Sequence, residues 1–112
     1  MIASFLDAAT DDLYHGRRTA RARRFPPRIA SQALRKLDVM NAAQRLDDLR
    51  SPPGNHLEAL AGNLMGFYSI RVNDQWRIIF RWIDNSAFDV SLTDYHYWTY
   101  ARCLLRQATI RK

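Results

Sequence analysis

The residues of this chain that could carry chemistry stand at or near the ends of predicted strands. The stretch DVSLTDYH, residues 89–96, closes a run of β-favouring residues with Asp94, Tyr95 and His96, and Arg77 lies inside an earlier run of the same kind. Cleavage of RNA by its own 2′-hydroxyl, without a metal, requires a base, an acid and a cation beside the phosphorus. Histidine transfers protons near neutral pH, and arginine offers phosphate a fixed fork of donors. On spacing alone, however, a tyrosine and a histidine that end a strand are more often surface residues than a catalytic pair.

The strands that must position these residues include a predicted hairpin. FYSIRV (residues 67–72) and QWRIIFRW (75–82) flank the dipeptide ND, which is typical of a tight two-residue turn. With that turn, Arg71 faces Trp76 and Ile70 faces Arg77. A third strand, FDVSLTDY (88–95), follows the turn DNSA. Alternation along the second strand separates an aromatic face, expected to pack on a helix, from a more open face. The aromatic face holds Trp76, Ile78, Phe80 and Trp82, and the open face holds Arg77, Ile79 and Arg81, near Tyr68 and Ile70.

The first half of the chain predicts helices and one basic segment. Residues 2–5, IASF, suggest a first strand, and residues 26–43 predict a helix that starts at its prolines. Its apolar face consists of Ile29, Ala33, Leu37 and Met40. A shorter helix follows at 43–50, and SPPGN at 51–55 turns the chain toward the sheet. Residues 15–28 contain six arginines and no acid, which indicates either a solvated, mobile loop or an arm that contacts phosphate, with Arg23 and Arg24 as its candidate RNA contacts. The predicted class is α+β, an antiparallel sheet with helices on one face.

The composition limits the classes of partner. The 112 residues suit one domain, and a net charge of +6 with a pI near 10.1 favours a polyanionic partner, either nucleic acid or an acidic protein surface. No run approaches the ~20 apolar residues of a membrane-spanning helix, so we expect no membrane association. Cys103 is the single cysteine, which excludes an internal disulfide and fits a cytoplasmic location. The three histidines are scattered, so we expect neither a metal site nor another cofactor.

A long segment of the chain resembles a known toxin family. The stretch LRSPPGNHLEALAGNLMGFYSIRVNDQWRIIFRW (49–82), followed by a strand that ends in DYH, is similar to the HigB branch of the RelE/ParE toxin superfamily. The resemblance covers residues 1–96 and implies a small curved antiparallel sheet with two to three helices packed on one face. Residues 97–112 would form a C-terminal extension with a helical pattern. This extension either covers exposed sheet or frays, or it brings Tyr97, Trp98 or Tyr100 to the site to stack on bases or obstruct it.

The resemblance also implies a function. HigB-type members are toxins of type II toxin–antitoxin modules that inhibit growth as ribosome-dependent endoribonucleases of messenger RNA, whereas ParE-type relatives poison DNA gyrase. Their partners would be a helix-turn-helix antitoxin, the ribosome and mRNA, with operator DNA contacted only through the antitoxin. By residue, Arg77 would act on the scissile phosphate, Tyr95 and His96 would stack and transfer protons beside Asp94, and Arg71 and Gln75 would contact RNA or ribosome.

The chain departs from the family pattern at two positions. Better-known members carry H-P-L-K-G ahead of the first hairpin strand, and alignment through Gly62 puts Glu58 at the histidine and Ala61 at the lysine. His56 comes two residues too early and would substitute only if the loop shifts; otherwise it is a surface residue. We therefore expect a weaker or differently organised nuclease. The alternative is a toxin with little or no catalysis that binds the ribosome or gyrase.

Overall fold

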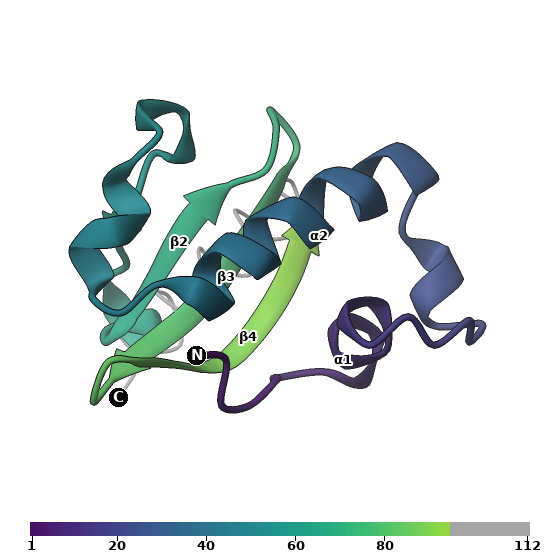
Figure 1. Ribbon diagram of the computed structural model, residues 1–112, viewed down its shortest axis with the longest axis horizontal. Coiled ribbons are helices and arrows are strands. Elements are labelled where there is room, and N and C mark those ends of the chain that lie inside the picture. Colours follow the sequence, from purple (N-terminus) through teal and green to yellow (C-terminus); the bar gives the residue numbers. More distant parts are fainter. Residues whose placement is uncertain (95–112) are drawn as a thin grey trace.

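The structure is a computed structural model that describes residues 1–94, and it is built from a four-stranded antiparallel sheet with helices on one face (Figure 1). Its α-helices are α1 (Ala8–Tyr14) and α2 (Pro27–Ala42), and its strands, in sheet order, are β1 (Glu58–Ala59), β2 (Phe67–Arg71), β3 (Trp76–Ile83) and β4 (Ser86–Asp94). Four 3-10 helices complete the described elements: η1 (Ala22–Arg24), η2 (Leu46–Arg50), η3 (Pro53–Asn55) and η4 (Gly62–Leu64). The predicted α+β class is confirmed.

Helix α2 crosses the sheet and closes the main core (Figure 1). It begins at Pro27, whose missing N–H is not needed in the first turn of a helix. Its predicted apolar face is buried, and Ala33, Leu37 and Met40 have no exposed surface. The same cluster contains Ile78 and Phe80 of β3, as well as partly buried Trp76 and Trp82. The aromatic face of β3 therefore packs on the helix, as predicted. The short helix predicted at 43–50 is the 3-10 helix η2, which buries Leu49.

The predicted register of the β2–β3 hairpin is wrong by one residue. Arg71 faces Arg77 and Ile70 faces Ile78, because the connection is a three-residue loop and not a two-residue turn. The Oδ1 atom of Asn73 accepts hydrogen bonds at 2.8 Å from the backbone N–H groups of Gln75 and Trp76, which stabilises the longer loop. A shift of one residue moves side chains to the other face of a strand. Ile70 and Tyr68 therefore belong to the core under α2 and not to the open face.

The N-terminal residues do not form the predicted sheet strand. Residues 2–5 run beside the outer edge of β4 and make two isolated parallel bridges, Ile2 with Ala87 and Phe5 with Val90. A regular ladder is interrupted there because the β3–β4 pairing contains a bulge near Asp89, whose φ is +53°. The segment nevertheless covers the β4 edge, which reduces the chance of edge-to-edge association.

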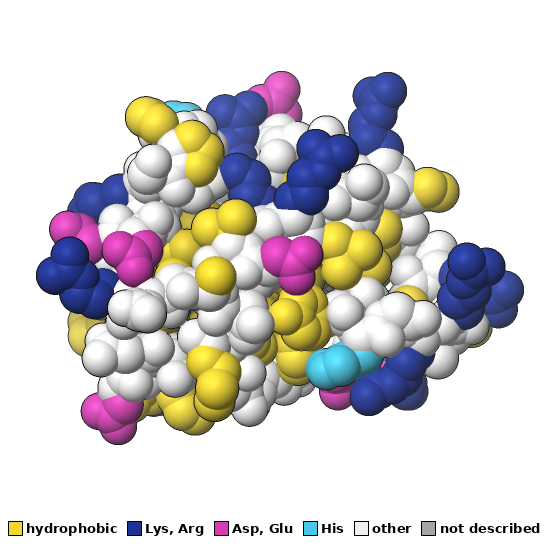
Figure 2. Space-filling model, viewed as in Figure 1, with side chains coloured by type: hydrophobic (Ala, Val, Ile, Leu, Met, Phe, Trp, Pro, Cys, Tyr) yellow, Lys and Arg dark blue, Asp and Glu magenta, His cyan; other side chains and the backbone are white. Residues whose placement is uncertain are grey.

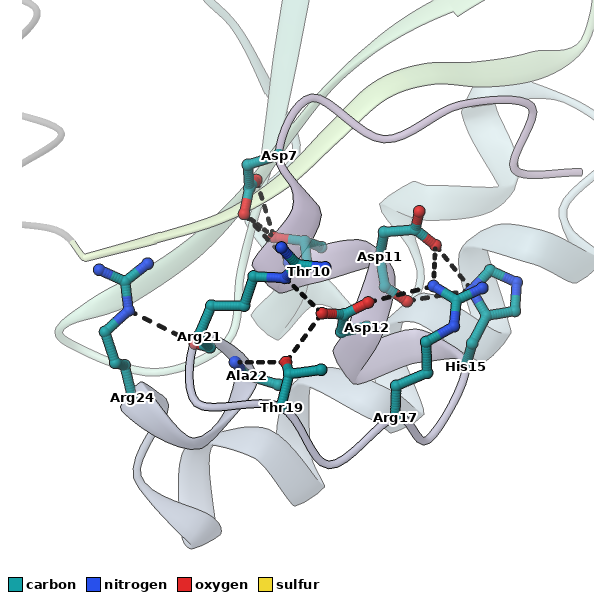
Figure 3. Close-up of polar contacts among 10 residues, drawn as sticks. All are labelled: Asp7, Thr10, Asp11, Asp12, His15, Arg17, Thr19, Arg21, Ala22 and Arg24. Carbon is teal, nitrogen blue, oxygen red and sulfur yellow. Dashed lines mark hydrogen bonds and ion pairs between the residues drawn. The ribbon is translucent and has the colours of Figure 1, made fainter.

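The basic segment at 15–28 is exposed along most of its length, but side-chain contacts tie it to α1 (Figure 3). Asp12 lies in helix α1, which the sequence did not predict, and it is only 2% exposed. It accepts hydrogen bonds from Arg21 Nε at 2.5 Å, Thr19 Oγ1 at 2.8 Å and Arg17 Nη1 at 3.1 Å. These donors, Arg21 foremost, lower the pKa of Asp12 from 3.8 to about 2. One carboxylate thus ties three residues of the basic segment to α1.

None of the helices within residues 1–94 has the length and apolar character that a membrane crossing requires.

Candidate functional site

Two facing arginines mark a hollow on the open side of the sheet. The arginine hollow, as we call it, has a volume of about 310 Å³ and is lined by His56, Arg71, Asn73, Asp74 and Arg77. Arg71 of β2 and Arg77 of β3 are direct cross-strand partners. Like charges in such a pair destabilise a sheet. Such a pair therefore needs compensating negative charge, from neighbouring carboxylates or from a bound anion.

Each arginine of the pair has a neighbouring carboxylate. Arg71 forms an ion pair with Asp74 of the hairpin loop. Arg77 Nη1 lies 3.6 Å from Glu58 Oε1 on β1 and donates a hydrogen bond of 3.1 Å to Ser69 Oγ on β2. The Arg77 side chain is only 15% exposed, so its guanidinium is held between strands in a defined orientation. A fixed guanidinium of this kind can bind phosphate oxygens without first being ordered.

The loop between η2 and β1 brings His56 to the arginine hollow. Asn55 is fully buried, and its Nδ2 donates hydrogen bonds to the carbonyl oxygens of Leu49 (3.1 Å) and Ser51 (3.2 Å). Its Oδ1 accepts a hydrogen bond from Lys36 of α2, whose pKa is lowered by burial. His56 follows directly, in the left-handed region with φ +45°, and its side chain lines the hollow.

In the sequence, His56 stands two residues ahead of the position of the family histidine, which made it a weak candidate. The structure places it before β1, at the end of η3, directly after Asn55 with its buried hydrogen bonds. The sequence offered one short indication of this loop, an asparagine directly after SPPG and before His56. Only the fold shows that this loop lies beside the β2–β3 hairpin.

The end of β4 reaches the same hairpin. Gln75 Nε2 donates a hydrogen bond of 2.9 Å to Asp94 Oδ2, and Thr93 faces Arg77 in the sheet. The predicted site residues Arg71, Gln75, Arg77 and Asp94 therefore lie in one region. Tyr95, His96 and the extension 97–112 lie outside the described residues. In residues 1–94, the structure contains no group of three or more His, Cys, Asp or Glu side chains that could hold a metal ion.

Arg23 and Arg24 do not line the arginine hollow. Both are exposed on η1, and Arg24 Nε donates a hydrogen bond of 3.4 Å to the backbone oxygen of Arg21. The next residue, Phe25, packs edge-on against Trp76 with ring centroids 5.8 Å apart. The Phe25 contact ties the end of the basic segment to the residue that precedes Arg77.

Comparisons with known proteins agree with this architecture. The model of a family described as RelE-like toxin of type II toxin-antitoxin system HigB matches residues 3–96. The chain is 42% identical over 97 residues to Toxin HigB-1 of Vibrio cholerae serotype O1. The aligned region covers 87% of this chain and 100% of that protein. An uncharacterized protein of Haemophilus influenzae is 39% identical over 74 residues, 66% of this chain and 73% of its own length.

The fold is also similar to solved toxin–antitoxin structures. A chain of the YoeB-YefM complex from Staphylococcus aureus superimposes with a TM-score of 0.53 at 17% sequence identity. The similarity covers 83% of this chain and 95% of that one. A heterotetrameric YoeB-YefM complex from the same organism gives the same TM-score at 18% identity. At this level of identity the similarity concerns the fold.

Proposed function

Because the chain belongs to the HigB-like family of RelE-like toxins of type II toxin–antitoxin systems, we propose that it is a ribosome-dependent endoribonuclease that cleaves messenger RNA. The reaction would use neither a metal nor an organic cofactor. The observation that carries this proposal is the arginine hollow, in which two facing arginines and a histidine line one concave surface. This arrangement provides both fixed positive charge and an imidazole, which is a side chain that can accept or donate a proton.

The proposed mechanism is attack of the 2′-oxygen on the adjacent phosphorus with departure of the 5′-oxygen. A base removes the proton of the 2′-hydroxyl, and an acid protonates the leaving 5′-oxygen, which gives a 2′,3′-cyclic phosphate and a 5′-hydroxyl. Arg77, with Arg71 beside it, would stabilise the charge that develops on the phosphate oxygens. His96 and Tyr95 are the proton-transfer and stacking groups that the family resemblance suggests. The position of His56 on the wall of the arginine hollow makes it the second candidate for proton transfer.

Two features favour a slower enzyme than better-known family members. We assign Glu58 and Ala61 to the positions at which those members carry the active-site histidine and lysine. The carboxylate of Glu58 pairs with Arg77, so a substrate phosphate would compete with it for the same guanidinium. A general acid or base typically contributes ~10²–10⁴-fold to a rate. Since Ala61 is exposed, the variant Ala61→Lys should fold and should cleave mRNA faster than the natural chain.

A toxin that binds its target without cleaving RNA is the second candidate. The observation that favours it is the pairing of Arg77 with Glu58, because a neutralised arginine stabilises phosphate less well. The target would then be the ribosome or DNA gyrase. Inhibition of supercoiling by the purified chain, without new mRNA ends in cells, would support this alternative.

The remaining assignments follow the same family membership. An antitoxin is the expected partner, and we propose that it is a helix-turn-helix protein through which the pair contacts operator DNA. We further propose that the chain acts in the cytoplasm, that residues 1–96 form the toxin domain and that 97–112 are an extension. Gln75 and Asp94 would contact RNA beside the cleavage site, and Arg23 and Arg24 on η1 would contact RNA outside the arginine hollow.

The test in cells is brief induction of the protein followed by mapping of mRNA 5′ ends. We expect cuts in phase with codons, and we expect Arg77→Ala to abolish them. Arg81→Ala is the matched control, because Arg81 lies on the same strand and face but does not line the arginine hollow. Cuts that persist in the Arg77 variant would remove this residue from the mechanism.

A further inference from the structure

A second hollow lies away from the arginine hollow, between α1, η1 and α2. It has a volume of about 850 Å³, and it shares no lining residue with the arginine hollow. Apolar side chains from three elements line it: Leu13 of α1, Ala22 of η1, Phe25 after η1, and Leu34 of α2. Figure 2 shows hydrophobic side chains exposed between α2 and the α1 region of the molecule. We call this site the apolar hollow.

Arginines surround the apolar hollow. Arg18 and Arg23 come from the basic segment and Arg35 from α2, and all three are exposed. Arg17 also lines it, but its guanidinium is engaged by Asp12 and Asp11. Basic side chains gather at this end of the molecule in Figure 2. The apolar hollow therefore combines apolar walls with a positive rim.

This combination fits a protein segment better than an RNA strand. Single-stranded RNA is usually bound by aromatic faces on which bases stack, beside cations for phosphate. The aromatic residue of this hollow, Phe25, is only 9% exposed and already packs edge-on against Trp76, so it offers no stacking platform. Apolar walls with arginines around them resemble the desolvated centre and charged rim of a protein interface.

Charge also argues against two other occupants. Residues 95–112 of the chain contain arginines and a lysine but no aspartate or glutamate, so the positive rim would repel them. A second copy of the chain carries the same net charge of +6 and would be disfavoured for the same reason. The rim instead complements a segment that is rich in Asp and Glu.

We propose that the apolar hollow docks an acidic amphipathic segment of the antitoxin. One or two apolar side chains of that segment would enter between α1 and α2, and its carboxylates would pair with Arg18 and Arg35. Arg23, which also lines the hollow, is shared between this contact and the proposed contacts with RNA. The inference rests on membership of a toxin–antitoxin family and is independent of whether the chain cleaves RNA.

The test uses the product of the reading frame adjacent to this gene as the probe, co-expressed and purified with the full chain. Ser31→Glu and Arg35→Glu place negative charge on the rim of the hollow, and both positions are exposed on α2. Arg28→Glu is the matched control for Arg35→Glu, because it makes the same charge change on the same helix outside the hollow. We expect Ser31→Glu and Arg35→Glu to weaken the complex at least tenfold at low salt and Arg28→Glu to change it less than threefold.

Several results would overturn the proposal. One is that the Ser31→Glu and Arg35→Glu variants bind the probe as tightly as the natural chain does. A second is normal binding of the probe together with lost binding to ribosomes, which would assign the hollow to RNA. A third is the absence of any complex with the natural chain. Cleavage of mRNA by the free variants is measured separately, so a failure of the proposed function would be distinguishable from a failure of this docking site.

Discussion

Asn55 gives the most direct test of how the fold builds the arginine hollow. Its side chain is buried between the η2–η3 turn and α2, where it donates to Leu49 and Ser51 and accepts from Lys36. His56 takes its left-handed conformation at the next position. Replacement of Asn55 by Ala should therefore lower stability and also release His56 from the hollow.

The expected magnitude follows from these bonds. The variant loses the bond from Lys36 and two neutral hydrogen bonds worth about 1 kcal/mol each, and the buried partners that remain unsatisfied add ~1–3 kcal/mol. We expect the free energy of unfolding to fall by about 3 kcal/mol. Since small domains are stable by about 5–15 kcal/mol, most molecules should remain folded. A loss of mRNA cleavage larger than the unfolded fraction would then report the displacement of His56.

The assay is urea unfolding of the natural chain, Asn55→Ala and the control Asn41→Ala. Asn41 lies in an exposed setting and accepts one hydrogen bond from the Ile2 N–H, so its truncation should cost about 1 kcal/mol or less. If the free energy of unfolding depends equally steeply on urea concentration in all three proteins and only the midpoint shifts, the change is one of stability. A loss below about 1 kcal/mol for Asn55→Ala, equal to that of the control, would refute the role of Asn55 as the anchor of this loop.

Other predictions concern the basic segment, the core and the turn between β3 and β4. Because the pKa of Asp12 is about 2 in the folded chain and 3.8 as its ordinary value, its contribution is present above about pH 4 and is lost as the pH falls toward 2. Acid unfolding followed by circular dichroism should therefore show a shallower dependence on pH for Asp12→Asn, and an unchanged curve would contradict the network. Leu37→Ala, at a fully buried position of α2, should lower the free energy of unfolding by ~2–5 kcal/mol in urea, and a change below 1 kcal/mol would contradict its place in the core. Asn85 has φ +62° in the turn, so Asn85→Val should cost ~1–2 kcal/mol whereas Asn85→Gly should be neutral or stabilising, and equal effects of the two would refute a left-handed turn.

The elements with strong periodicity were predictable from the sequence. Pro27 and the spacing of the apolar residues predicted helix α2. The alternation of aromatic or aliphatic residues with arginines predicted β3. Arg77 was placed on the correct face for the same reason. The register of the hairpin was not predictable from alternation, because the hydrogen bonds accepted by the Asn73 side chain add one residue to the loop.

The remaining errors concern contacts between residues distant in sequence or in separate elements. Asp12 organises the basic segment through partners five to nine residues away, and composition alone made that segment look like a loop. The N-terminal residues lie beside β4 through bonds that span most of the chain, such as that from the Asp89 N–H to Ser4 Oγ. His56 lines the arginine hollow directly after the buried Asn55, and no local pattern indicates that burial.

The proposed cleavage of messenger RNA on the ribosome depends above all on Arg77. The most direct measurement incubates the purified chain with one mRNA, either free or bound in a programmed ribosome, and follows the cleaved fraction with time. We expect cleavage only in the presence of the ribosome, with a loss of at least 100-fold in Arg77→Ala and little change in Arg81→Ala. Equal cleavage of free and ribosome-bound mRNA, or undiminished cleavage by Arg77→Ala, would contradict the claim.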